Sequence, residues 1–161
     1  MSFEEIRVIT VVYTAVLLPL IIYWKYKSRL PKWIPSFYII SLVVCSLGWE
    51  LWFTYGWLDG DPVDIRRSEN LNKWLPKDIN WLLNSMGDAG AVLLGGAWLM
   101  WITHKKNLMI FKKWNWTAFL VLYIWCVSQN IFVEMFLYHD QLADGKPLSW
   151  APLSPFGPYF N

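Results

Sequence analysis

Four long apolar runs limit what this chain can fold into. They cover about residues 6–24, 37–57, 81–103 and 114–138, and each is near the roughly 20 residues that an α-helix needs to cross a bilayer. A helix in lipid satisfies its backbone hydrogen bonds within one segment. The sequence therefore predicts an all-α integral membrane protein, with a four-helix bundle over residues 1–147 and a Pro- and aromatic-rich ordered tail at 148–161.

The composition agrees with this class and excludes several others. Of the 161 residues, 56% are hydrophobic, 13 are Trp and only 16% are charged, against about 25% charged in soluble domains. A disordered chain, a disulfide scaffold and a basic nucleic-acid module are excluded. Cys45 and Cys126 lie inside apolar runs and are expected to be free buried thiols. We predict no metal site, no cofactor and no nucleic-acid partner.

Charge in the connecting loops predicts the orientation. The loop after the first run and the loop after the third run carry basic residues and no acid, whereas the loop at 58–80 carries both signs. The basic residues are Lys25, Lys27, Arg29, Lys32, Lys105, Lys106, Lys112 and Lys113. The positive-inside rule makes these two loops cytoplasmic, so both termini are expected on the non-cytoplasmic side. Tryptophans near the run ends, Trp81 among them, are expected to form an aromatic belt.

Ionisable groups inside apolar runs are costly in lipid, so each is a candidate for function. Three carboxylic acids lie in the runs: Glu50, Asp88 and Glu134. At about 1.5 Å per residue, Glu50 and Asp88 lie roughly 21–24 Å from the basic end, and Glu134 lies close to the other interface. Amide side chains accompany them in the third and fourth runs, namely Asn84, Gln129 and Asn130. These residues predict a polar pocket shared by the second, third and fourth runs.

Three roles are open for these polar groups. Two carboxyls held close in a low dielectric do not both ionise readily, so Glu50 and Asp88 are candidates for an acid and a base. Such a pair suits the addition of a proton at one carbon and its removal at another. The groups could instead bond to one another as structural contacts between helices. An ion path is a third alternative, although the basic half of the runs has few polar residues.

A stripe of small residues in the third run predicts close helix packing. Gly87, Ala91 and Gly95 recur at every fourth position, which lets another helix approach closely. That helix belongs either to this chain or to another membrane subunit. The tail at 148–161, with its prolines and aromatic residues, is a second candidate surface for such a subunit.

Three short motifs resemble the emopamil-binding (EXPERA) superfamily of sterol-isomerase-like membrane proteins. The second run reads ELWFTY at 50–55, followed by LDGD at 58–61. The third run contains MGDA at 86–89, and the fourth contains NIFVE at 130–134, followed by Tyr138. The resemblance covers about residues 40–146. Ser46 stands where the family has a histidine, and the Pro-rich tail stands where the family has a last helix.

This resemblance implies a membrane cavity for a flat polycyclic lipid such as a sterol or terpenoid. Glu50 and Asp88 would handle protons, and Trp49, Trp52 and Tyr55 would line the cavity. We therefore expect a protein that binds a lipid-like ligand and, if it is an enzyme, isomerises it with paired carboxyls. The alternative is a non-catalytic accessory subunit of a larger membrane complex.

Overall fold

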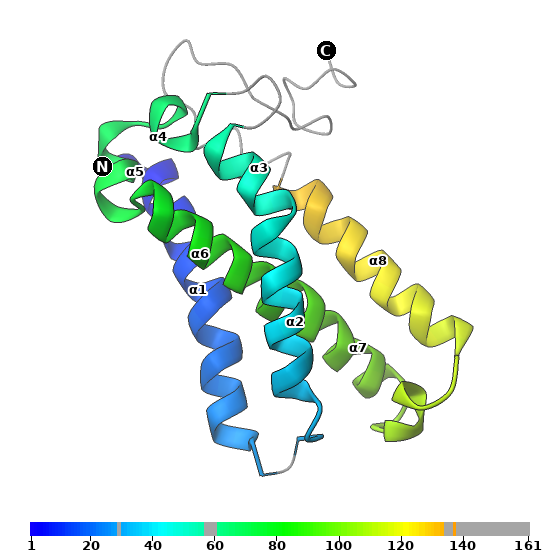
Figure 1. The fold of residues 1–161 in the computed structure, drawn as a ribbon. Coiled ribbons are helices and arrows are strands. Elements are labelled where there is room, and N and C mark those ends of the chain that lie inside the picture. Colours follow the sequence, from blue (N-terminus) through cyan, green and yellow to red (C-terminus); the bar gives the residue numbers. More distant parts are fainter. Residues whose placement is uncertain (29, 57–60, 134–136, 138–161) are drawn as a thin grey trace.

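A computed structural model describes residues 1–28, 30–56, 61–133 and 137, and in these residues the chain is all-helical, as predicted (Figure 1). The first half contains α1 (Phe3–Tyr26), α2 (Ile34–Leu47), α3 (Trp49–Tyr55), α4 (Val63–Arg66) and α5 (Glu69–Trp74). The second half contains α6 (Lys77–Gly87), the π-helix η1 (Asp88–Leu94), α7 (Gly95–Thr103), the 3₁₀-helix η2 (Leu108–Phe111) and α8 (Trp116–Phe132). The predicted tail at 148–161 lies outside the described residues.

Two helical segments are long and apolar enough to cross a membrane. One is α1, with 24 residues, and the other is the continuous segment α6–η1–α7, with 27 residues. Helices α2 and α3 together make a third candidate that is bent by 40°. Helix α8 is apolar but shorter, with 17 residues. The four helical segments correspond in position to the four apolar runs, and two or three of them are compatible with crossing a membrane.

Local capping explains where several helices begin. The Ser2 hydroxyl accepts a hydrogen bond from the Glu5 N–H over 3.2 Å, and the Glu5 carboxylate accepts one from the Ser2 N–H over 2.9 Å. This reciprocal pair satisfies two N–H groups at the start of α1. The Asn115 side chain similarly accepts from the Ala118 N–H at the start of α8. The polar residues that flank the apolar runs thus define the helix ends.

The third span crosses the molecule diagonally and holds the other helices together (Figure 1). Helix α6 packs on α1 and α3, η1 packs on α1 and α2, and α7 packs on α8. A Cβ atom at Gly87 would lie 3.4 Å from Ala15 in α1, and one at Gly95 would lie 3.5 Å from Trp125 in α8. These two members of the small-residue stripe therefore pack within the chain.

Helices α4 and α5 form a cap over one end of α1, α3 and α6 (Figure 1). Val8 of α1 packs with Leu71 and Leu75 of the cap in one buried cluster. Phe53 of α3 packs with Val63 of α4 in a second cluster, and Val133 after α8 joins it. The cap thus fastens the ends of all four helical segments to one another.

Candidate functional site

The second helical segment, α2–α3, breaks at Gly48, two residues before Glu50. Gly48 has φ −100° and ψ −111°, and a Cβ atom there would lie 2.8 Å from the Val44 carbonyl oxygen. The glycine therefore permits the bend between α2 and α3. Beside this break, the Ser46 carbonyl accepts a hydrogen bond of 2.8 Å from the Trp81 indole N–H of α6. A break in a span leaves backbone groups that need such partners, because lipid supplies none.

Glu50 is buried where α3, α6 and η1 meet. Its side chain is 4% exposed, and Thr54, one turn further along α3, is 0% exposed. Asp88 of η1 and Asn84 of α6 act on the Glu50 carboxyl through their charge and polarity. The Thr54 hydroxyl also lies close enough to interact with this carboxyl, although Oε2 of Glu50 makes no hydrogen bond of good distance and angle among the described residues. The structure therefore brings the two predicted acids and Asn84 together and leaves hydrogen-bonding capacity unused beside them.

Asp88 is the first residue of the π-helix in the third span. A π-helical segment inside an α-helix is rare, and such segments frequently occur at functional sites. The Val92 carbonyl of η1 accepts a hydrogen bond of 2.9 Å from the Trp125 indole N–H of α8. Each of the two irregular segments beside the acids thus receives an indole hydrogen bond from another helix.

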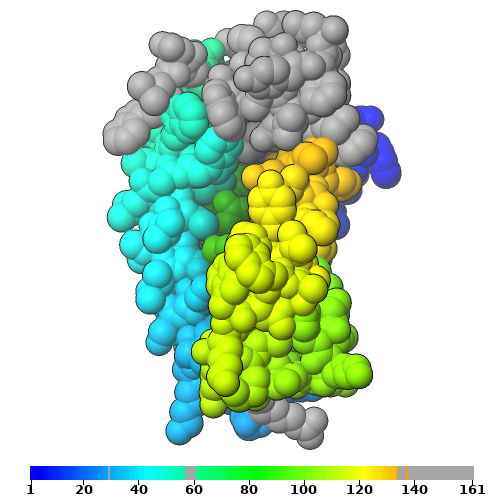
Figure 2. Space-filling model, turned by 90° about the vertical axis from the view of Figure 1, so that its right-hand side faces the viewer, coloured from blue at the N-terminus to red at the C-terminus, as the bar shows by residue number. Residues whose placement is uncertain are grey.

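A hollow opens between α2–α3 and α8, with the third span as its floor (Figure 2). We call it the lateral hollow. Phe53, Val63 and Val133 pack together at its cap end. At the opposite end, the rings of Trp33 and Phe111 meet edge to face with their centroids 5.2 Å apart. Figure 2 shows the lateral hollow open to the surface between α2–α3 and α8.

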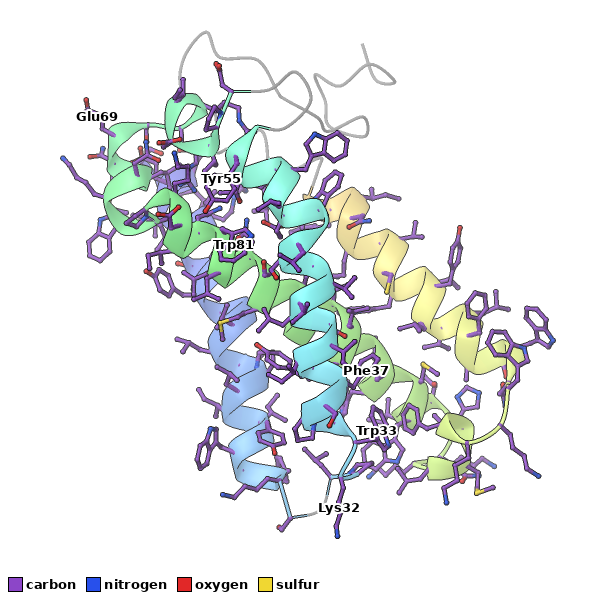
Figure 3. The ribbon with its side chains drawn as sticks, in the orientation of Figure 1. Lys32, Trp33, Phe37, Tyr55, Glu69 and Trp81 are labelled. Atoms are coloured by element: carbon purple, nitrogen blue, oxygen red, sulfur yellow. The ribbon has the colours of Figure 1, made fainter. Side chains whose placement is uncertain are left out.

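The predicted aromatic lining divides into two groups. Trp49 and Trp52 contact each other edge to face, with centroids 5.3 Å apart, and both are half-buried. Tyr55 instead faces α6, as Figure 3 shows, because its ring meets Trp81 and its hydroxyl donates to the Asp78 carboxylate over 2.8 Å. Tyr55 thus helps to join α3 to α6.

The amides of the fourth run make no hydrogen bond to the two acids among the described residues. Gln129 is half-buried and Asn130 is exposed on α8. In the part of the chain that the structure describes, no hydrogen bond joins either of them to Glu50 or Asp88. Glu134 lies outside the described residues. The acid cluster therefore involves the second and third spans, and α8 contributes the opposite wall of the lateral hollow.

Sequence reasoning missed the two tryptophans that bind backbone carbonyls at the irregular segments. Trp81 was expected in the aromatic belt, yet its indole reaches a break in a neighbouring helix. A signal for the break at Gly48 was a glycine two residues before an acid inside an apolar run. A glycine there marks a break, and a break requires a hydrogen-bond donor from another helix.

Two buried arginines fix the cap at the end of this site. Arg66 donates to the carbonyls of Phe53 and Asp61, and its guanidinium lies over the Phe53 ring. Arg67 donates to the Asn80 side chain over 2.9 Å and to the Leu75 carbonyl over 2.6 Å. Burial, together with the neighbouring charge of Arg66, lowers the pKa of Arg67 to about 10. Arg67 is therefore still a cation at neutral pH.

The site consists of two neighbouring carboxyls, of which Glu50 is buried. Among the residues that the structure describes, no three His, Cys, Asp or Glu side chains come together as metal ligands. Comparison of the chain with protein-family models, curated proteins and solved structures finds no match. The functional argument therefore rests on the residues themselves.

Proposed function

We propose that this chain is a four-span membrane protein that binds a lipid-like ligand, of the sterol or terpenoid class, in the lateral hollow. The observation that carries the proposal is the buried Glu50 carboxyl, whose Oε2 atom has no hydrogen-bond partner among the described residues and which lies near Asp88. If no ligand bound there, the protein would be more stable with this carboxyl fully hydrogen-bonded or replaced by an apolar side chain. In this proposal the four helical segments form a bundle, the basic loops are cytoplasmic and both termini lie on the opposite side.

The reaction that suits this pair is a shift of a carbon–carbon double bond. The protonated carboxyl of one acid donates its proton to one alkene carbon, which leaves a cation on the neighbouring carbon. The carboxylate of the other acid removes a proton from the next carbon, and the double bond forms there. Aromatic faces such as those of Trp49 and Trp52 stabilise the intermediate cation. Protons and electrons balance, and no cofactor is consumed.

The resemblance to the EXPERA superfamily supports the same proposal. The family's acid positions correspond to Glu50 on α3 and Asp88, which directly follows α6, and α3 packs against α6. Ser46 replaces the family's histidine, and here its carbonyl accepts the Trp81 indole N–H. In our proposal Asp88 therefore acts as the second proton-handling group.

A photoreactive sterol analogue tests the binding. The purified chain in lipid nanodiscs is irradiated with the analogue, and labelled peptides are identified by mass spectrometry. We expect labels on α2, α3 or α8, and at least a tenfold loss of labelling in Glu50→Gln and Asp88→Asn. Glu69→Gln removes an exposed carboxylate in the cap and is the matched control. Parent-like labelling of Glu50→Gln would refute the site. Conversion of an unsaturated sterol, followed by gas chromatography, tests the isomerisation separately.

The second candidate is an accessory subunit of a larger membrane complex. The observation that favours it is the lateral hollow, which has an open side where a helix of a partner would fit. Because Gly87 and Gly95 pack within the chain, the partner contacts would in this case involve Ala91 of the small-residue stripe and the tail at 148–161. Gentle purification from native membranes distinguishes the two candidates. Foreign subunits in fixed stoichiometry, lost on deletion of the tail, favour the accessory role, whereas a chain that carries only lipid favours the first proposal.

A further inference from the structure

One end of this molecule carries cations and no acids. The sequence has no acid between Glu5 and Glu50, and none between Asp88 and Glu134. The loops at the ends of α1 and α7 therefore carry cations alone. The described lysines of this basic end, all of them exposed, are Lys25, Lys27, Lys32, Lys105, Lys106, Lys112 and Lys113. None of them has an ion-pair partner among the described residues, so a counter-charge has to come from outside the chain.

An aromatic contact joins the two basic loops. The Trp33 ring meets Phe37 of α2 edge to face at 5.7 Å and Phe111 of η2 at 5.2 Å. Lys32 directly precedes Trp33, and Lys112 directly follows Phe111. Figure 3 shows Lys32 and Trp33 at this end of the molecule, with Phe37 just above them. Two lysines that are far apart in the sequence thus flank one apolar contact.

The backbone directly after α7 is left-handed at two consecutive lysines. Lys105 and Lys106 have φ angles of 53° and 60°, in the left-handed region that non-glycine residues avoid. The Lys106 N–H donates to the Trp101 carbonyl over 2.9 Å, and this turn sends the chain back toward η2. Strain of this kind persists when the surrounding structure requires it, and it is concentrated at functional sites. Here it maintains a cluster of like charges that repel one another.

We propose that this end of the molecule binds an anionic phospholipid, with the headgroup phosphate between Lys32 and Lys112. The lipid chains then follow the apolar surface of α2 from the Trp33–Phe111 contact toward the lateral hollow. A phospholipid suits this surface better than a free phosphate because exposed apolar side chains of α2 adjoin the charges. These include Ile39, Ile40, Val43 and Val44. The proposal does not depend on the carboxyl site or on its ligand.

Native mass spectrometry of the detergent-purified chain tests this proposal. The protein is titrated with phosphatidylglycerol and, in parallel, with phosphatidylcholine of the same chain length. A lysine near a membrane surface contributes about 1 kcal/mol to binding, so we expect a roughly thirty-fold loss of phosphatidylglycerol affinity in the double variant Lys32→Gln/Lys112→Gln. Phosphatidylcholine binding should not change.

Matched variants separate a local site from diffuse attraction. Lys25→Gln/Lys27→Gln removes the same charge from the same end but away from the aromatic contact. Its affinity for phosphatidylglycerol should fall less than fivefold. Phe111→Ala keeps every charge but removes the contact between the loops. Its affinity for phosphatidylglycerol should fall at least tenfold. Equal losses in the two lysine variants, or no loss in Phe111→Ala, would overturn the proposal.

Two further measurements complete the test. Inorganic phosphate at millimolar concentration should not displace phosphatidylglycerol, and complete displacement would assign the site to a free anion instead. Thermal unfolding in the same detergent checks each variant, because the lysines are exposed and their replacement should leave the midpoint within about 2 °C. If Phe111→Ala is unfolded, Trp33→Phe with its smaller ring provides the second loop-contact variant, and parent-like affinity there would count against the proposal.

Discussion

The Trp81 indole N–H donates a hydrogen bond of 2.8 Å to the carbonyl oxygen of Ser46. This bond joins the beginning of α6 to the break between α2 and α3, two residues before the bend that precedes Glu50. The position of Glu50 therefore depends on a donor from another span. Two further contacts hold the same two helices together. The Tyr55 hydroxyl donates a hydrogen bond to Asp78, and the rings of Tyr55 and Trp81 meet edge to face.

Replacement of Trp81 by Phe should weaken this arrangement. The ring remains, but the part-buried Ser46 carbonyl loses its donor, which costs about 1–3 kcal/mol in the free energy of unfolding. Reversible unfolding in mixed micelles measures the loss. Trp98→Phe is the control, because Trp98 is 53% exposed on the same span. Equal stability of the two variants would mean that the bond does not support the break.

Gly48→Ala should disturb the bend itself. The added Cβ atom would lie 2.8 Å from the Val44 carbonyl oxygen, which is backbone and cannot turn away. We expect a loss of about 1–3 kcal/mol in unfolding free energy, together with weaker labelling by the sterol analogue. Gly95→Ala offers a contrast, because its Cβ atom would lie 3.5 Å from Trp125 in ordinary contact. A Gly48→Ala variant that labels and unfolds like the parent contradicts this reading.

The stability of Glu50→Gln distinguishes a ligand site from a structural contact. A buried carboxyl that has an oxygen without a hydrogen bond and a second acid nearby lowers the free energy of unfolding. Functional sites commonly retain residues that are unfavourable for stability in this way. We therefore expect Glu50→Gln to unfold with a free energy about 1 kcal/mol higher than the parent, as measured by chemical unfolding in micelles. Glu69→Gln, at an exposed position, should change by less than about 0.5 kcal/mol. A clear loss in Glu50→Gln would instead support the role of a bond between helices.

Arg67→Lys should destabilise the cap. The guanidinium donates to the Asn80 side chain, the Asn72 side chain and the Leu75 carbonyl. A lysine keeps the charge but lacks the planar fork that reaches all three acceptors. Loss of one or two charged hydrogen bonds predicts a decrease of about 2–4 kcal/mol in unfolding free energy. Lys73→Gln, exposed on α5, is the control, and an equal effect of both substitutions would exclude a stabilising role for the network.

The helical class and the approximate helix positions were predictable from the apolar runs, and the structure confirms them. The break at Gly48 was not predicted, because the apolar run continues through it without a change of composition. The π-helix at Asp88–Leu94 was not predicted either, because its residues are equally compatible with an α-helix. The sequence predicted a shared depth for Glu50 and Asp88, and the structure brings them together. It also predicted that Gln129 and Asn130 share their pocket, which stays a prediction.

Length, hydropathy and charge order along the chain are properties of the sequence alone, and they are sufficient to predict apolar helices and one end that carries cations without acids. Which side chains meet depends on the rotation of each helix about its axis and on contacts between distant segments. The bonds of Trp81 and Trp125, the cluster around Glu50 and the contact of Trp33 with Phe111 are all of this second kind. Tertiary packing decided them, because a uniformly apolar helix presents no stripe from which its orientation can be read.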